Sequence, residues 1–347
     1  MSEDIQQLHR FAYKTFREIL TDGYILFAKN WLKIIVPMAL FSVISIIIKD
    51  LILPDLIWNQ YLITSEVEII LNKDPYSITN ADLQVLLRYL SLTFGMVIID
   101  FIIGAFFTVL AMCSVSTYLL KKYKGLDVNF FQELKASFNS KLFIVLIIIG
   151  LVVPLGTILL IPGIILFKLF IFSIFTYRDE KIEKPLKEAK IIAKGSLWKL
   201  LGIFLITFGI PFIINLFIFQ PLLDFAVSNA TYTSWYDPIT RNYLMIILYD
   251  LLYQLINILL IPLFVCFLTT FYRSLEAKKT IAYQYQIQPL QTRYRNLDVE
   301  KYKELPGDQI NQKYKFESGL YCPYCGFFME KKPERCPHCN ESLDFEF

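Results

Sequence analysis

Long apolar stretches separated by short polar segments dominate the first 275 residues. A helix that crosses a bilayer needs about 20 mainly apolar residues, and four stretches meet this length: 34–53, 92–120, 200–222 and 243–271. The chain is 55% hydrophobic and only 19% charged, whereas a soluble domain is about 25% charged. The pattern predicts an all-α transmembrane protein.

A fifth apolar stretch, 142–177, is too long for one span. Its 36 residues contain one charge, Lys168. As a single helix they would measure about 54 Å, against a hydrocarbon core of about 30 Å. Four helix-breaking residues lie in its middle: Pro154, Gly156, Pro162 and Gly163. We therefore predict a hairpin of two spans, 142–158 and 161–177, and a bundle of six helices.

The polar segments between the spans carry unequal charge. Segments 121–141 and 178–199 hold 12 Lys or Arg in 43 residues, whereas 50–91 and 223–242 hold three in 62. By the positive-inside rule the two basic segments are cytoplasmic, so the hairpin must cross the membrane twice. The predicted location is the cell membrane, multi-pass, with both termini in the cytoplasm.

The two basic segments also contain short amphipathic patterns. Apolar residues recur at helical spacing beside lysines in 127–141 and 185–199. We expect two cytoplasmic amphipathic helices in the inner headgroup layer of the lipid bilayer, with their lysines towards anionic lipid. The alternative is that both segments are ordinary solvated connectors.

Three charged residues fall well inside the predicted spans, away from their ends, where charge is expensive. Asp100, Lys168 and Asp250 each lie roughly 10–12 Å below the outer surface, counted at about 1.5 Å per residue. Matched depth predicts an intramembrane polar cluster. Such a cluster either fixes helix register or forms a substrate or proton site.

Three glycines repeat every seven residues along the fifth span and its entry. They are Gly195, Gly202 and Gly209. Small residues on one helix face let a neighbouring helix approach closely, so the spacing predicts a helix-packing face.

The hairpin and the segment after it resemble a known family. The stretch IPGIILFKLFIFSIFTYRDE, followed by KPLKEAKIIAKGSLWKL, is similar to the prokaryotic family named for the glycerophosphoryl diester phosphodiesterase membrane domain. The matching residues are Pro162, Gly163, Lys168, Leu186, Lys187, Lys194, Gly195 and Trp198, whereas Pro185 and Ala189 depart from the pattern. The resemblance spans about residues 10–275. It implies a six-helix membrane protein without the phosphodiesterase catalytic domain.

The C-terminal part has a different composition. Residues 275–319 are polar and read as a cytoplasmic linker of partly extended or disordered character, which leaves 1–274 as the six-span domain. Residues 320–347 contain two C-x-x-C motifs with ten residues between them: Cys322, Cys325, Cys336 and Cys339.

Four such cysteines suit one tetrahedral zinc ion, and the segment resembles the short zinc-ribbon family. With all four positions filled by thiolates, the predicted zinc is structural, in a small C-terminal β ribbon. Thioredoxin-like redox sites are the alternative, but these need a βαβ context that the segment lacks.

No catalytic arrangement is recognisable, so we expect no enzyme. The only histidines are His9 and His338, and no Gly-rich phosphate loop is present. Two hypotheses follow. One is a membrane scaffold or assembly protein whose zinc ribbon docks a protein partner. The other is a transporter or permease-like protein that uses Asp100, Lys168 and Asp250. Acidic residues around the ribbon disfavour nucleic acid.

Overall fold

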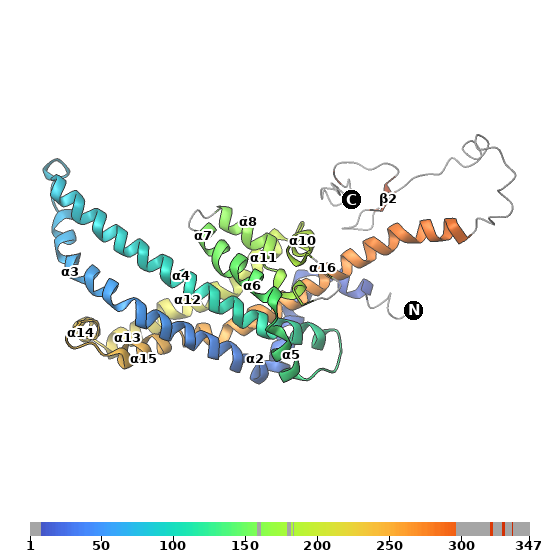
Figure 1. Ribbon diagram of the computed structural model, residues 1–347, viewed down its shortest axis with the longest axis horizontal. Coiled ribbons are helices and arrows are strands. Elements are labelled where there is room, and N and C mark those ends of the chain that lie inside the picture. Colours follow the sequence, from blue (N-terminus) through green and yellow to red (C-terminus); the bar gives the residue numbers. More distant parts are fainter. Residues whose placement is uncertain are drawn as a thin grey trace. The chain divides into compact units, whose positions relative to one another are not determined.

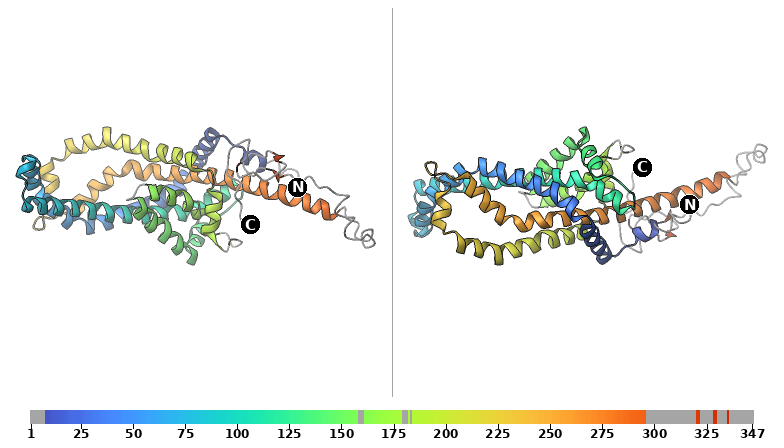
Figure 2. Two further views of the ribbon diagram at one scale, coloured as in Figure 1. Left: turned by 90° about the horizontal axis from the view of Figure 1, so that it is seen from above. Right: turned by 90° about the horizontal axis from the view of Figure 1, so that it is seen from below.

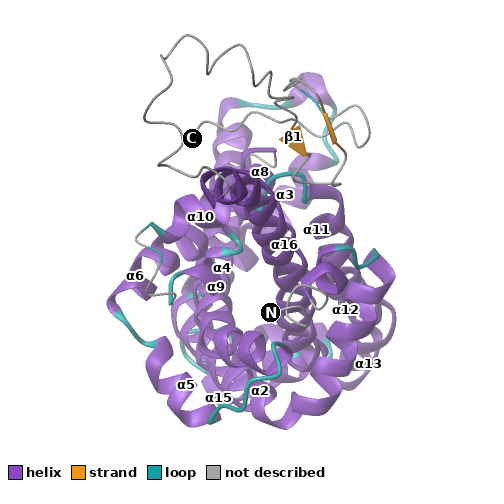
Figure 3. Cartoon of the chain, turned by 90° about the vertical axis from the view of Figure 1, so that its right-hand side faces the viewer, coloured by secondary structure: helices purple, strands orange, loops and turns teal. Residues whose placement is uncertain are grey.

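The computed structural model of the protein describes residues 8–157, 161–178, 182, 184–295, 320–321, 328–329 and 335. They belong to two compact units. The membrane unit is Leu20–Thr270, and the terminal unit combines Met1–Ile19 with Phe271–Phe347. Apart from short loops and one pair of strands, the described residues are helical (Figure 3).

In chain order the helical elements are α2 (Phe16–Ile52), α3 (Pro54–Leu71), η1 (Pro75–Ser77), α4 (Asn80–Tyr123), α5 (Phe130–Ser137), α6 (Ser140–Ile147), η2 (Ile148–Val152), α7 (Val153–Thr157), α8 (Ile161–Phe170), α9 (Ser173–Thr176), α10 (Pro185–Ile192), α11 (Leu197–Phe204), η3 (Leu205–Gly209), α12 (Ile210–Ile214), η4 (Asn215–Phe219), α13 (Gln220–Ala226), α14 (Asn229–Ser234), α15 (Tyr243–Tyr253) and α16 (Leu255–Arg295).

Four helical stretches in the described part are long and apolar enough to cross a membrane, and a bent fifth is added if α5 and the helix after it count as one span. The four are Phe16–Ile52, Asn80–Tyr123, Leu197–Ala226 and Leu255–Ile281. A helix satisfies its own backbone hydrogen bonds, as lipid requires. The predicted all-α transmembrane class is therefore confirmed, with four to five candidate spans by length.

Helices α2 and α4 run antiparallel along their length (Figure 1). Polar pairs join them at three levels: Asp22 with Tyr123 at 2.6 Å, Asn30 with Tyr118 at 3.1 Å, and Lys49 with Asp100 at 2.7 Å. Because these contacts pair early residues of α2 with late residues of α4, the register between the two helices is fixed from one end to the other.

Helix α4 is longer than a bilayer needs, since its 44 residues extend over about 66 Å. Its first turn is fixed by a capping box, in which Thr79 and Asp82 each accept a hydrogen bond from the other's backbone N–H. The first part of α4 packs beside α3, with Gln60 donating to Thr93 at 2.7 Å. Segment 50–91, expected to be a loop, is therefore largely helical.

Three π-helical turns interrupt the α-helices, and each ends two residues before a proline. They are η2 before Pro154, η3 before Pro211 and η4 before Pro221. Proline lacks an N–H, and its ring clashes with the carbonyl four residues earlier. A wider turn with i→i+5 bonding accommodates that carbonyl. Leu197–Ala226 can thus continue as one helical stretch.

The hairpin predicted in 142–177 is present as two packed arms. The first is α6, η2 and α7, and the second is α8 and α9; residues 158–160 between them lie outside the described part. A Cβ on Gly156 would lie 3.4 Å from the Cα of Gly163, so the arms approach closely near the turn. The second arm belongs to the shorter apolar helices, of 10–17 residues.

In the terminal unit, the helical residues 8–12 pack on α16. Ala12, Ala277 and Ile281 form a buried cluster, with Leu8 and Phe11 packed against it. The guanidinium of Arg273 also lies 5.2 Å from the centroid of the Phe11 ring, a cation–π contact.

Helix α16 continues to Arg295, well beyond its apolar part (Figure 2). The prediction of an extended or disordered linker is therefore wrong for 275–295. Ala277 and Ile281 lie four residues apart on one face of α16, and the N-terminal segment covers them. This packing stabilises a helix that a polar composition alone does not predict.

Candidate functional site

Four charged side chains from three helices form a polar cluster in the membrane unit, the outer cluster. The Nζ of Lys49 in α2 lies 2.7 Å from a carboxylate oxygen of Asp100 in α4. The carboxyl groups of Asp50 in α2 and Asp250 in α15 are close enough to interact electrostatically. Asp50 is 5% exposed.

The carboxyl groups of Asp50 and Asp250 repel each other when both are ionised. A carboxylate only accepts hydrogen bonds, so a hydrogen bond between these two groups would need a proton on one of them. The second oxygen of Asp50, Oδ2, is buried and has no hydrogen-bond partner among the described residues. A buried polar atom without a partner is costly. Among the described residues, the outer cluster therefore retains one unsatisfied polar atom and two neighbouring carboxyl groups.

Aromatic hydroxyls lie beside this carboxyl pair. The hydroxyls of Tyr232 and Tyr236 are 2.8 Å apart, and Tyr236 is buried. The Tyr232 ring packs on Tyr249, whose ring centroid is 4.8 Å away.

The predicted intramembrane cluster of Asp100, Lys168 and Asp250 needs a correction. Asp100 and Asp250 do lie in one cluster, but the cation is Lys49. Lys168, half-buried in α8, forms no ion pair with a residue that the structure describes. Equal depth does not bring two helices into contact, and α2, not α8, is the helix that pairs with α4 here.

Sequence reasoning missed Lys49 and Asp50. Both were counted with the end of the first span and the loop after it, although apolar residues continue on both sides, in ISIIIKDLILPDLIW. A charge pair flanked by apolar sequence is the signal that identifies them.

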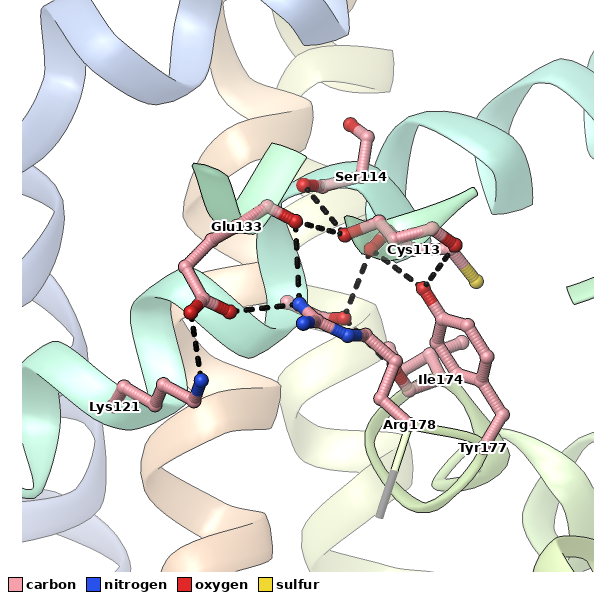
Figure 4. A network of polar contacts seen from close by, with 9 residues as sticks. Cys113, Ser114, Lys121, Glu133, Ile174, Tyr177 and Arg178 are labelled. Carbon is pink, nitrogen blue, oxygen red and sulfur yellow. Dashed lines mark hydrogen bonds and ion pairs between the residues drawn. The ribbon is translucent and has the colours of Figure 1, made fainter. Parts of the chain in front are cut away.

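A second polar network, the inner network, joins the far end of α4 to α5 and to the segment after α9 (Figure 4). Glu133 in α5 pairs with Lys121 at 2.6 Å and with Arg178 at 2.7 Å. Arg178 also donates to the backbone oxygen of Glu133, at 3.2 Å. Burial alone would raise the pKa of Glu133, but the hydrogen bonds from Lys121 and Arg178 outweigh it and hold that pKa below its ordinary value.

Backbone oxygens complete the inner network. The Tyr177 hydroxyl is shared between the carbonyls of Cys113 and Ser137, at 3.2 and 3.1 Å. Ser116 donates to the carbonyl of Ile174 at 2.7 Å. All five residues contribute polar atoms that would otherwise be unsatisfied in an apolar core. The inner network therefore clamps α4, α5 and α9 together.

The predicted zinc ligands Cys322, Cys325, Cys336 and Cys339 lie outside the described residues. The strands β1 (Leu320–Tyr321) and β2 (Phe328–Met329), which flank the first C-x-x-C in sequence, pair antiparallel. Cys113 and Cys266 are buried free cysteines. Within the described residues, no three His, Cys, Asp or Glu side chains are placed to hold a metal ion.

The predicted helix-packing face of Gly195, Gly202 and Gly209 is wrong for two of its members. Gly195 lies in the turn between α10 and α11 with φ 76°, a left-handed conformation that favours glycine. A Cβ on Gly209 would meet nothing within 4 Å. The close helix contacts occur instead at other glycines, such as Gly150, where a Cβ would lie 3.1 Å from the Cα of Phe106.

Comparison with models of known protein families, with curated proteins and with solved structures found no match.

Proposed function

We propose that this chain is a non-enzymatic membrane scaffold whose C-terminal zinc ribbon docks a protein partner in the cytoplasm. The observation that carries the proposal is the uninterrupted helix α16, which runs from an apolar stretch to Arg295 and is braced by Phe11 and Ala12. A helical connection has a defined length and direction, unlike a flexible polar linker. It therefore suits a protein that presents a binding module.

The terminal unit supports an even number of spans. The packing of residues 8–12 on 273–281 of α16 favours a chain that enters and leaves the membrane on the same side. The hairpin 142–177 counted as two spans then gives six, an even number. The basic segments 121–141 and 178–199 favour the cytoplasm for that side.

A structural zinc ion would fold the ribbon. The antiparallel pairing of Leu320 with Met329 is the strand pair expected around a first zinc knuckle. In the proposed ribbon, Cys322 and Cys325 supply two thiolates and the second C-x-x-C supplies the other two. A segment this small has no core of its own, so metal binding would provide most of its folding energy.

The docking role can be tested by copurification in mild detergent. We would compare the full chain, a 1–295 truncation that keeps α16 whole, and a Cys322→Ser/Cys325→Ser variant. The expected result is one zinc per full chain, with loss of the zinc and of the copurifying partner in both altered proteins. Cys266→Ala, which removes a cysteine buried in α16, is the matched control and should keep both. Identical copurifying proteins in all samples would refute docking by the ribbon.

The likeness to the glycerophosphoryl diester phosphodiesterase membrane domain family remains part of the proposal. The segment from Pro162 to Trp198 carries it. It fits a six-span membrane unit without its own catalytic centre.

A second candidate, a proton-coupled transporter, rests on the Asp50–Asp250 contact and the unpartnered oxygen of Asp50. Intramembrane carboxyl groups are typical of proton relays. Vesicles containing the protein and a trapped pH-sensitive dye would report proton flux. Asp250→Asn should abolish the flux on this hypothesis, whereas Asp224→Asn, an exposed carboxylate in α13, should not. Absence of flux in the unaltered protein would reject the transporter.

A further inference from the structure

Helix α10 and the start of α11 present lysines and an indole ring at the end of a membrane helix. We infer that this surface, made by Lys187, Lys190 and Trp198, binds the headgroups of anionic phospholipids selectively. The inference goes beyond the scaffold proposal, because it does not depend on what the zinc ribbon binds. It also does not require any partner protein.

The orientation of α10 is fixed by its buried face. Pro185, Ala189 and Ile192 are buried, and the Thr176 hydroxyl donates to the carbonyl of Pro185 at 2.9 Å. Lys187 and Lys190 lie on the opposite, exposed face. The two lysines therefore point away from the protein because the helix is anchored by its apolar side.

The charge of this surface is not neutralised by the surrounding residues that the structure describes. Segment 184–199 contains five lysines and one glutamate, and Asp179, Glu180 and Glu183 precede it in the sequence. The lysines near α5 are used internally: Lys121 pairs with Glu133, and Lys141 donates to the carbonyl of Ile182 at 3.1 Å. Lys187 and Lys190 have no ion pair or hydrogen bond with any residue of the described part. Within the described part, their charge is therefore available to an external anion.

Trp198 fixes the depth of the surface. It is 82% exposed and is the second residue of the apolar stretch Leu197–Ala226, which is long enough to cross a membrane. Tryptophan prefers the headgroup level, where its ring is apolar and its N–H is hydrated. The turn at Gly195 joins α10 directly to this stretch. The lysines of α10 therefore lie at the level of lipid phosphates.

A lipid surface fits these features better than a soluble anion or a folded partner. Lysines and exposed apolar side chains share one short segment here, with Ile191 47% exposed beside Lys190. An interfacial helix combines apolar insertion with attraction to anionic lipid. Each lysine near an anionic membrane surface strengthens binding by roughly fivefold at low salt.

The test uses the full chain in lipid nanodiscs made of phosphatidylcholine with phosphatidylglycerol. Bound lipids are identified by native mass spectrometry after mild release. We expect enrichment of phosphatidylglycerol around the unaltered protein, and roughly a 20-fold loss of the preference in Lys187→Gln/Lys190→Gln. Arg88→Gln is the matched control, because Arg88 is an exposed cation in the far part of α4, and it should keep the preference.

Two further measurements test the inference even if the variant Lys187→Gln/Lys190→Gln folds poorly. Added salt should weaken the preference in the unaltered protein, because exposed charges are screened. Brominated phosphatidylglycerol should quench tryptophan fluorescence more than brominated phosphatidylcholine, and Trp198→Phe should remove that difference. Equal binding of both lipids by the unaltered protein, or an equal loss in Arg88→Gln, would overturn the inference.

Discussion

Replacing Glu133 by glutamine tests whether the inner network holds the membrane unit together. Glutamine keeps the shape of the side chain and removes its charge. Arg178, whose side chain is 13% exposed, would then be buried without a counter-charge. Its bond to the backbone oxygen of Glu133 would remain, so the variant isolates the ionic contact.

The expected loss follows from burial. Removing one partner of a buried ion pair costs about 3–5 kcal/mol. Lys121 is 35% exposed, so its contact with Glu133 is screened by solvent and contributes little. The retained backbone hydrogen bond to Arg178 reduces the penalty further. We therefore expect Glu133→Gln to lower the free energy of unfolding by about 2–4 kcal/mol.

The assay is unfolding of the detergent-solubilised protein by increasing SDS, followed by tryptophan fluorescence. The matched control is Asp127→Asn. Asp127 and Lys122 are 2.7 Å apart, the same distance that separates Glu133 from Arg178, but Asp127 is fully exposed. We expect no measurable change in the control. If both variants unfold at the same SDS concentration, burial does not determine the strength of these contacts and the reasoning fails.

Three other predictions follow from local geometry. The pKa of Glu133 lies below its ordinary value of 4.5, so the stability that its ion pairs contribute is present above pH 4.5 and is lost as the pH falls further. Measuring the unfolding midpoint at decreasing pH should show this loss in the unaltered protein. The Glu133→Gln variant should not show it. Gly23→Ala should destabilise the membrane unit by about 1–3 kcal/mol, since a Cβ there would overlap the Phe267 ring, whereas Gly104→Ala meets open space and should not lower the thermal midpoint. Asp82→Ala, which removes the acceptor for the Thr79 N–H, should remove the capping box of α4 and speed hydrogen exchange in the first turn of that helix.

The helices of the membrane unit were predictable because their signal is local. Apolar runs predicted four stretches that are long enough to cross a membrane, and the prolines and glycines around 154–163 predicted the hairpin. The π turns were not predicted. They depend on how a helix adjusts around Pro154, Pro211 and Pro221, which the apolar pattern does not encode.

The partners within the outer cluster were not predictable from depth. Counting residues along each span placed Asp100 and Asp250 at one level, and the structure brings both into the outer cluster. Which cation joins them depends on the register between α2 and α4. That register is set by contacts such as Asn30 with Tyr118, and no spacing within a single segment specifies it.

The helical part of α16 beyond residue 275 was missed because its sequence was considered without its tertiary contacts. Polar composition between 275 and 295 indicated a linker, but two apolar residues, Ala277 and Ile281, are enough to pack the N-terminal segment. Tertiary contact often decides whether a weakly apolar segment is helical. The prediction considered the segment alone and could not include that contact.

The outer cluster and the inner network differ in a way that distinguishes the two hypotheses, a membrane scaffold (a platform) and a proton-coupled transporter (a conduit). In the inner network, Glu133 is paired with both Lys121 and Arg178, and a satisfied buried network adds rigidity. In the outer cluster, Asp50 has a buried oxygen without a hydrogen-bond partner in the described part, and it lies beside the carboxyl group of Asp250. Uptake of a proton would relieve the repulsion between these two carboxyl groups, whereas in the inner network it would break the ion pairs of Glu133.

The two hypotheses therefore predict different outcomes for the variant Asp250→Asn. An amide can donate permanently to Asp50, so in a platform the variant should be at least as stable as the unaltered protein, because a proton is no longer needed for the contact. It should also retain its copurifying partner. In a conduit the same variant should fold normally but lose proton flux, since the exchangeable proton is gone. A variant that keeps both its partner and its flux would show that the Asp50–Asp250 contact is dispensable for either role.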